Sequence, residues 1–339
     1  ILAIGREAWD MSLATVALCK YNLGWASVGI CTHAFYEAIN HASNRVLFRH
    51  KVTEFSHIQQ FFVDAYSRLV AMKLFARRAS DYMRAASEED KRYLLYNPMV
   101  KMKVTMQGEE VINLLWDVIA ARGFEKDLYF EMAARDIRGL PKLEGTAQVN
   151  MVLILKFIDN FLFNPTELPE LPKNDSLGND AFMFTQGSTS KAQNKILFDD
   201  YNKAYDQFKQ LENIRIFRTQ IDAYKELIKN CPPEKDQTRD LDFMLIYGEL
   251  FTLIAYGQLV LEAAKIENLD TDLVDQILDF MVRDFSKFAV QLYSKTSSTP
   301  AQMEACLKMV RKPVPNATRY EKVTKEYVYA LNGQYTMNP

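Results

Sequence analysis

The stretch Phe55–Ala86, FSHIQQFFVDAYSRLVAMKLFARRASDYMRAA, decides the fold class. Apolar side chains recur in it every three to four positions, which is the spacing of one face of an α-helix. This apolar stripe comprises Phe62, Tyr66, Leu69, Met72, Ala76, Ala79 and Met83. Charged side chains such as Asp64 and Arg68 fall mostly on the other faces. The pattern therefore predicts a long helix with one packed face and one solvated face.

The same helical period continues along the rest of the chain, where strand-like alternation is almost absent. Asn97-Pro98 is typical of a helix start, and the helix that it predicts runs to about Arg122. Gly139-Leu140-Pro141 separates a short predicted helix over 128–135 from a longer one over 146–164. Further helices are predicted near 195–230, 238–267, 271–295, 300–311 and 318–333. The sequence thus predicts an all-α protein, a helical bundle followed by a second helical domain.

A proline-rich and then glycine- and serine-rich stretch divides the predicted helices into two groups. Pro165, Pro169 and Pro172 open it, and Gly187-Ser188-Thr189-Ser190 lies near its end. This composition is typical of a connection that runs over the surface. We therefore predict a helical bundle over 1–164, a linker over 165–194 and a helical carboxyl-terminal extension over 195–339.

Composition and charge exclude several classes of function. The 339 residues are 48% hydrophobic and 25% charged, which is the balance of a globular protein. A net charge of -2 offers no basic surface for nucleic acid. The four cysteines show no CxxC spacing, so we expect reduced thiols and a cytoplasmic location. The apolar run over 243–261 carries Glu249 near its centre and therefore predicts a buried bundle helix, with no membrane span.

Common motifs for metal and phosphate binding are missing from the sequence. The four histidines, His33, His41, His50 and His57, lack the spacing of metal ligands, so we expect them to have packing roles and expect no metal site. The run Gly187–Lys191 lacks the residue order of a phosphate loop and is better explained as linker.

Glu144 occupies a turn between two predicted helices, flanked by Leu143 and Gly145. Neighbours that shield such a carboxylate from water would raise its pKa toward the range that a general base needs. On these residues alone, an ordinary exposed glutamate near a helix start is the better explanation, because turn carboxylates are common and helix N-termini favour acidic side chains.

Several short motifs keep a fixed register along the first 164 residues. They are Asn44-Arg45-Val46-Leu47-Phe48, Gly123-Phe124, Arg135-Asp136 and Glu144-Gly145-Thr146-Ala147-Gln148. Together they resemble the carboxyl-terminal helical domain of the acyl-CoA dehydrogenase family, over about residues 6–164. The phrase Leu140–Thr146 and the extension beyond 165 are similar to the larger, long-chain-type members, which carry an extra helical domain.

The resemblance implies an enzyme that converts an acyl thioester to a trans-2-enoyl thioester by α,β-dehydrogenation. It implies that Glu144 removes the α-proton, that hydride passes from the β-carbon to N5 of FAD, and that the Glu144 backbone N–H helps to polarise the thioester carbonyl. The implied FAD contacts are Arg45, Phe48, Gly123, Thr146 and Gln148, with Arg45 reaching the cofactor of a neighbouring subunit. Lys20 and Gly145 are implied to contact the substrate.

Four positions depart from the family pattern. Arg49 replaces a glycine, Ser56 replaces a glutamine, Ala120-Ala121 replaces a glycine pair, and Lys20 stands where many members have arginine. The added methyl groups at 120 and 121 fall where a backbone approaches the cofactor closely.

The family's amino-terminal helical domain and its middle β-domain have no counterpart in this sequence, which opens at Ile1 without Met. We expect these domains on the same, longer chain or on a companion chain. The expected partners are an acyl-CoA or acyl-carrier thioester, an electron-transfer acceptor, and further copies in a homo-oligomeric dimer or tetramer that acts in fatty-acid β-oxidation.

Two other hypotheses stay open at this point. A split or truncated subunit could keep the bundle for assembly and no longer turn over substrate. An unrelated helical bundle could present grooves to partner helices, for which the apolar stripes alone suffice.

Overall fold

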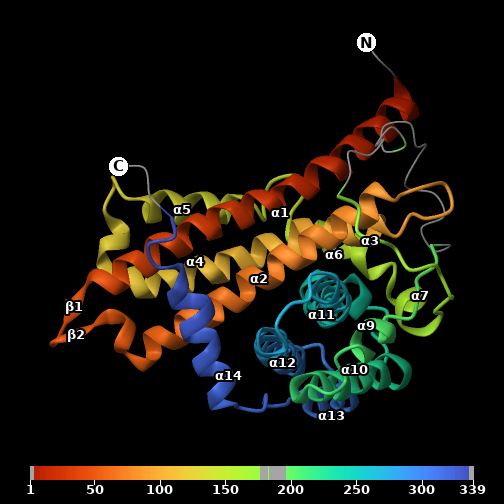
Figure 1. Ribbon diagram of the computed structural model, residues 1–339. Coiled ribbons are helices and arrows are strands. Elements are labelled where there is room, and N and C mark those ends of the chain that lie inside the picture. Colours follow the sequence, from red (N-terminus) through yellow and green to blue (C-terminus); the bar gives the residue numbers. More distant parts are fainter. Residues whose placement is uncertain (1–3, 176–181, 183–195, 336–339) are drawn as a thin grey trace.

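The computed structural model describes residues 4–175, 182 and 196–335, and these residues are almost entirely helical (Figure 1). The first part holds α1 (Gly5–Asn44), β1 (Val46–Leu47), β2 (His50–Lys51), η1 (Val52–Glu54), α2 (Ser56–Arg84), α3 (Tyr93–Met99), η2 (Val100–Val104), α4 (Thr105–Ile119), η3 (Ala120–Phe124), α5 (Tyr129–Gly139), α6 (Ala147–Leu155) and α7 (Ile158–Phe163). The second holds α9 (Asn202–Asp206), α10 (Glu212–Asn230), η5 (Gln237–Arg239), α11 (Leu241–Ile266), α12 (Thr271–Tyr293), α13 (Pro300–Met309), α14 (Ala317–Lys322), η6 (Val323–Val328) and η7 (Tyr329–Leu331). The predicted all-α fold class is confirmed.

Helices α1, α2, α4 and α5 form the bundle, and α1 runs parallel to α4. Small residues let these two helices approach: the Ser27 hydroxyl donates to the Val104 carbonyl at 3.2 Å. A Cβ added at Gly108 would lie 2.0 Å from the Ser27 hydroxyl oxygen, so glycine is required there. The helix α2 lies on α1 with its predicted stripe buried, Phe62, Met72, Ala76 and Ala79 among it. The period of the sequence thus identified the apolar stripe, but the predicted solvated face is wrong. Arg68 on that face is also buried, because α12 covers it and Asp284 of α12 pairs with Arg68.

The predicted helix start at Asn97-Pro98 is wrong. Helix α3 begins at Tyr93 and passes through Pro98, and the π-helix η2 follows it directly. Asn97 is buried and its amide lies 3.3 Å from the Met83 sulfur, so it packs in the core instead of capping a helix. The register change of the π-helix separates α3 from α4 after the proline, which is how the chain accommodates a proline inside helical structure.

Helix α11 is the centre of the carboxyl-terminal extension. It packs on α2 and α6 of the bundle and on α12, so the buried core is continuous from one predicted domain to the other. By length and composition it is the one helix in the described residues that could cross a membrane, and 89% of its apolar window is buried inside the protein. This is the predicted buried bundle helix. The domain division at 165–194 stays a prediction, and residues 176–181 and 183–195 lie outside the described part.

Two predicted helices are interrupted. The segment 146–164 forms α6 and α7, and within 195–230 only α9 and α10 are α-helical in the described residues.

The last helices, α14, η6 and η7, return to the bundle (Figure 1). The Tyr329 hydroxyl donates to the Thr53 carbonyl at 2.5 Å, and the Tyr335 ring stacks on Tyr36 with ring centres 5.2 Å apart. Helix η7 therefore lies beside η1, and Tyr335, at the end of the described chain, lies against α1. The strands β1 and β2 pair antiparallel, with Val46 opposite Lys51.

Candidate functional site

Glu144 lies in the turn over 141–145, between α5 and α6, which we call the Glu144 turn. The backbone of Glu144 has φ +51° and that of Gly145 has φ +87°. Glycine adopts this left-handed region freely, whereas a glutamate there is held at a cost of order 1–3 kcal/mol. Such strained residues cluster at functional sites, so the conformation of Glu144 supports its candidacy independently of the motif.

The side chain of Glu144 is exposed in this chain, and so is that of Leu143. Among the described residues, the neighbours of Glu144 therefore do not shield its carboxylate, which agrees with the exposed glutamate near a helix start that the sequence also allows.

Two buried lysines lie beneath the turn. Lys20 on α1 is 8% exposed, and Lys101 on η2 is fully buried. Burial lowers the pKa of Lys20, and the nearby Glu144 carboxylate opposes that shift. Burial also lowers the pKa of Lys101 to about 8, with Lys20 and Lys142 acting in the same direction and Glu144 against it. Lys20 and Glu144, both predicted site residues, are thus brought together by the fold.

The remaining predicted residues of this region open α6. Thr146 is its N-cap, with an extended backbone, and its exposed side chain makes no capping hydrogen bond. Gln148 is exposed on the first turn. Asn150, which the sequence analysis missed, is fully buried and donates to the carbonyls of Gly145 at 3.1 Å and Thr146 at 2.9 Å.

One predicted site residue, Arg45, lines a groove of about 730 Å³ at the other end of α1, which we call the Arg45 groove. Arg45, at the end of α1, contributes to one wall, and Ala121 and Arg122 contribute to the other. Its remaining lining residues are Glu37, Asn40, His41, Asn44, Ile119, Glu125, Leu128, Tyr129 and Phe130.

The Arg45 groove carries charges of both signs, since Glu37 and Glu125 line it together with Arg45 and Arg122, and Arg122 lies 3.8 Å from Glu125. Burial lowers the pKa of His41 first, and the guanidinium groups of Arg45 and Arg122 lower it further. The amides of Asn40 and Asn44 lie in the same groove and add neutral hydrogen-bond donors. This donor set suits the phosphates of a dinucleotide, which arginine binds well.

The hairpin beyond Arg45 carries Phe48 at its tip. Phe48 is 88% exposed, with φ +52°, and Arg49 follows with φ +72°. Positive φ at both central residues is the geometry of a tight hairpin turn, which favours glycine at the position that Arg49 occupies. The hairpin therefore presents an uncovered aromatic ring beside the groove.

Ala120 has a backbone conformation that is usual only for glycine. It has φ +58° and ψ -142°, a region that residues with a Cβ rarely enter. Gly123, three residues on, is buried, and a Cβ there would lie 2.5 Å from the Trp116 indole nitrogen. Gly123 thus packs against Trp116, and it follows Ala121 and Arg122, which line the Arg45 groove.

The predicted site residues fall into two sets that do not meet. Lys20 and Arg45 lie on one helix, and a rise of about 1.5 Å per residue puts them roughly 38 Å apart.

The sequence analysis missed Lys101 and Asn150, because their roles depend on contacts between distant segments of the chain. The available signal was a single polar residue within an apolar run, Val100-Lys101-Met102 and Val149-Asn150-Met151.

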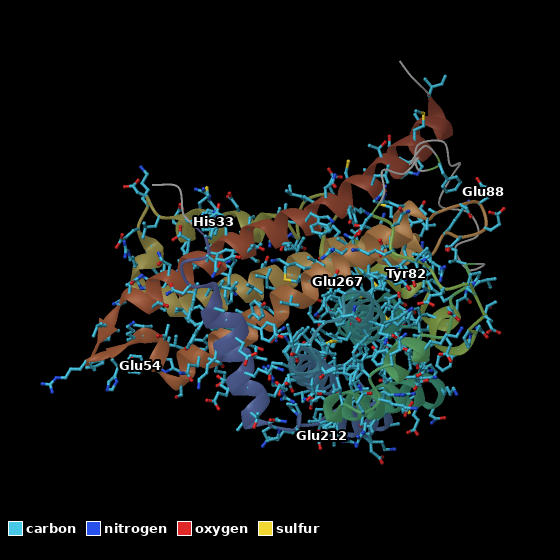
Figure 2. All side chains as sticks on the ribbon, viewed as in Figure 1. His33, Glu54, Tyr82, Glu88, Glu212 and Glu267 are labelled. Atoms are coloured by element: carbon cyan, nitrogen blue, oxygen red, sulfur yellow. The ribbon has the colours of Figure 1, made fainter. Side chains whose placement is uncertain are left out.

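The described residues hold no group of three or more histidine, cysteine, aspartate or glutamate side chains arranged for a metal ion. His33 packs its ring on Tyr129 with ring centres 3.8 Å apart, and Figure 2 shows it on α1. His50 lies 2.9 Å from Glu54 on the surface.

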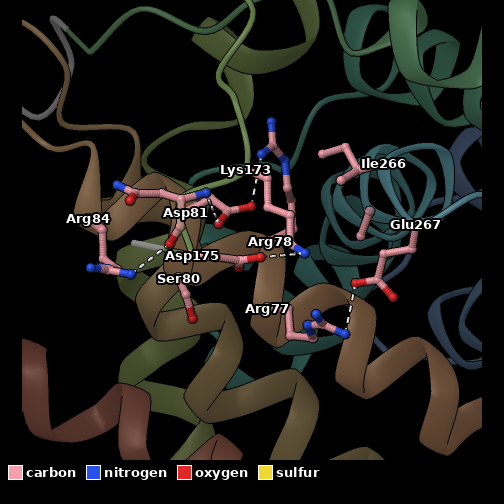
Figure 3. A pocket seen from close by; sticks show the side chains of 11 residues that line it. Arg77, Arg78, Ser80, Asp81, Arg84, Lys173, Asp175, Ile266 and Glu267 are labelled. Carbon is pink, nitrogen blue, oxygen red and sulfur yellow. Dashed lines mark hydrogen bonds and ion pairs between the residues drawn. The ribbon is translucent and has the colours of Figure 1, made fainter. Parts of the chain in front are cut away.

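Another pocket, of about 270 Å³, lies where α2 meets the end of α11 (Figure 3). Two arginine side chains that line it already bind other groups of the protein. Arg77 pairs with Glu267 at 2.9 Å, and Arg84 donates to the Asn174 carbonyl at 2.6 Å. We assign no ligand to it.

Comparison with known proteins matches this architecture. Residues 9–158 match the family described as acyl-CoA dehydrogenase, C-terminal domain. The chain is 24% identical over 154 residues to the 3-(aryl)acrylate reductase of Clostridium sporogenes, covering 45% of this chain and 40% of that protein. It is 22% identical over 155 residues to the acryloyl-CoA reductase (NADH) of Anaerotignum propionicum, covering 45% and 38%.

A solved structure resembles nearly the whole chain. The acyl-CoA dehydrogenase of Bacillus anthracis, complexed with FAD, has a TM-score of 0.62 at 13% identity, over 96% of this chain and 57% of that one. At this identity the likeness shows the fold, and it includes the extension.

The bundle therefore matches the acyl-CoA dehydrogenase carboxyl-terminal domain over residues 9–158, and a second helical unit follows it. The chain spans less than two thirds of the length of each of these relatives.

Proposed function

We propose that this chain is the carboxyl-terminal part of an FAD-dependent acyl-CoA dehydrogenase, with Glu144 as its base. The strained turn carries this proposal: Glu144 keeps a costly left-handed backbone over two buried lysines, within a family match over 9–158. Strained backbones of this kind cluster at active sites, which supports a role for Glu144.

In the proposed reaction Glu144 accepts the α-proton of an acyl thioester, and the carbon chain loses hydride from its β-carbon to leave a trans-2-enoyl thioester. FAD, when bound, supplies the two-electron acceptor at N5. The Glu144 backbone N–H donates to the thioester carbonyl, which makes the α-proton acidic enough to transfer.

The Arg45 groove supplies guanidinium and amide donors for the phosphates of FAD, next to the carboxylates of Glu37 and Glu125. Arg45 and Arg122 would hold phosphate oxygens, and Asn40 and Asn44 would add neutral donors. The roughly 38 Å along α1 between Arg45 and Lys20, which lies near Glu144, supports the idea that each chain serves two cofactors, one through each set.

We therefore propose a homo-oligomer, at least a dimer, in which Arg45 and Phe48 reach the cofactor of the neighbouring copy. Val46, Leu47 and Phe48 are all exposed at the hairpin, and an uncovered apolar surface of this kind favours a protein partner. The amino-terminal and β-domains, on this polypeptide or a companion, would shield Glu144 and complete the thioester pocket. A cytoplasmic location and a role in β-oxidation stay predictions.

The substitution Glu144→Gln in the complete assembly tests the proposal. Wild-type protein with bound flavin should lose its yellow absorbance when an acyl-CoA is added. The Glu144→Gln variant should bind flavin equally and bleach at least about a hundredfold more slowly, because it has no proton acceptor. Glu131→Gln on α5 is the matched control and should bleach at the wild-type rate.

Two other outcomes decide between functions. Reduction of an enoyl thioester is the second candidate, favoured by the two acrylate reductases among the relatives. Reduced flavin reoxidised by an acrylyl thioester, with no bleaching by the saturated one, would support it. A preparation that is colourless and stays so with added FAD would instead support a subunit used only for assembly.

A further inference from the structure

The Glu144 turn is held from below at both of its ends by fully buried polar side chains. The Lys101 ammonium donates to the carbonyl of Pro141, where the turn begins. The Asn150 amide donates to the carbonyls of Gly145 and Thr146, where it ends. Both side chains are 0% exposed, so these bonds form away from competing water.

Burying an ammonium is costly unless it has a partner, and Lys101 makes no ion pair within 4.0 Å among the described residues. Its recorded hydrogen bond is the one to the Glu144 turn. A hydrogen bond from a charged donor is about twice as strong as a neutral one, so this single contact is well suited to fixing a backbone position.

The π-helix η2 is what directs Lys101 to the turn. Each π-helical turn shifts the register of the following side chains relative to an α-helix, and π-helical turns are frequent at functional sites. Lys101 and Lys103 lie on the same short π-helix, yet Lys103 lies over the Tyr256 and Phe288 rings, on the side of the extension.

Side chains of α1 and α4 donate hydrogen bonds to carbonyls of this π-helix. Ser27 donates to the carbonyl of Val104, and Thr105 donates to the carbonyl of Lys101 at 2.5 Å. Gly24 lets α1 approach closely, because a Cβ there would lie 2.9 Å from the Val100 carbonyl oxygen. Contacts within the bundle thus stabilise the π-helical conformation of η2.

We propose that Lys101 and Asn150 are positioning residues that together hold the Glu144 backbone in its left-handed conformation. The arrangement is a clamp: Lys101 fixes the start of the turn, Asn150 fixes its end, and the strained residue lies between them. The proposal rests on Glu144 being the base. Neither residue touches the reacting carbons, so their effect on catalysis passes through Glu144.

Hydrogen–deuterium exchange of the 141–147 backbone in the 339-residue chain tests the clamp directly, without any activity. Lys101→Met and Asn150→Leu should each raise exchange in that segment roughly tenfold or more, as loss of a charged or double hydrogen bond predicts. Lys101→Arg, which keeps a charged donor, should stay close to wild type. Lys103→Met is the matched control, a buried lysine of the same π-helix with no contact to the turn.

The proposal is overturned if Lys101→Met leaves the 141–147 exchange unchanged, or if Lys103→Met raises it as much. Should Lys101→Met fail to fold, the comparison of Asn150→Leu with Lys103→Met decides by the same criterion.

In the complete assembly Lys101→Met should lower kcat for acyl-CoA oxidation and preserve flavin content and KM, with Lys101→Arg restoring kcat. A wild-type rate in Glu144→Gln would reject the proposed base whatever the exchange data show. A disabled Glu144→Gln together with a fully active Lys101→Met would reject the clamp alone.

Discussion

The Arg68 guanidinium on α2 donates to both carboxylate oxygens of Asp284 on α12, at 2.7 and 2.9 Å. Both side chains are buried, and the pair joins the bundle to the carboxyl-terminal extension. Burial alone would raise the pKa of Asp284, yet the Arg68 charge holds that pKa well below its usual range. The extension is thus attached through a desolvated ion pair in addition to apolar packing.

Removing one partner of this pair should destabilise the fold. Asp284→Asn leaves a buried guanidinium with Glu110 and Asp64 as its remaining acidic neighbours. We expect a loss of about 3 kcal/mol in the free energy of unfolding, measured by urea denaturation. Glu321→Gln, which breaks the exposed pair with Lys325, should change stability little. Equal losses from the two substitutions would contradict this account.

Ala120→Gly should stabilise the protein, by about 1 kcal/mol. The backbone at 120 already has the φ +58° and ψ -142° that glycine tolerates and alanine does not. Ala121→Gly is the neighbouring control; without a positive φ, residue 121 gains nothing from glycine and should lose stability through chain entropy. The midpoints of denaturant unfolding for the two variants should therefore shift in opposite directions.

Replacing Gly24 or Gly29 of α1 with alanine should change the stability of the fold in opposite directions. Gly24→Ala places a Cβ 2.3 Å from a Val100 methyl group and 2.9 Å from the Val100 carbonyl oxygen, a backbone atom that cannot easily move. We expect a loss of about 1–3 kcal/mol. Gly29→Ala meets nothing within 4 Å and should gain up to about 1 kcal/mol from helix propensity. Thermal unfolding of both variants checks this, and a Gly24→Ala protein as stable as wild type would show that α1 can move away from η2.

Glu249→Gln should change how stability depends on pH. Glu249 is 2% exposed, one of its oxygens is buried without a hydrogen-bond partner, and burial raises its pKa above 4.5. When a carboxyl group has a higher pKa in the folded protein than in the unfolded chain, its contribution to stability is fully present at pH values below its pKa in the unfolded chain. That contribution is lost as the pH rises through its pKa in the folded protein.

The free energy of unfolding of Glu249→Gln should therefore increase relative to that of wild type as pH rises. At pH 4 the melting temperatures should be similar, and by pH 8 Glu249→Gln should melt higher, because it has no charge to bury. The exposed Glu304→Gln serves as control and should follow wild type at both pH values. A constant difference between Glu249→Gln and wild type across that range would refute the explanation.

The sequence predicted the fold class and the long helices because their apolar period is local information. The stripe on α2 and the buried α11 needed no knowledge of their partners. The motif residues also predicted Glu144 and Arg45 as site residues, and the structure places them in two separate sets.

The errors have a common cause, since each depends on contacts between distant segments. Asn97 has the form of a helix cap but is buried against Met83, so packing decides its role. The left-handed backbones at Ala120 and Glu144 lack the glycine that would have marked them. Lys101 and Asn150 meet the Glu144 turn through contacts that no spacing rule encodes.

The length of α1 has a consequence for mixtures of variants. If its two ends serve different cofactors, a hybrid dimer of one Glu144→Gln copy and one Arg45→Ala copy assembles both defects around a single flavin and leaves the other intact. Combining two inactive preparations should then regenerate up to half the normal number of working centres per hybrid. Genetic rescue between two defective alleles would follow from the geometry of a single long helix.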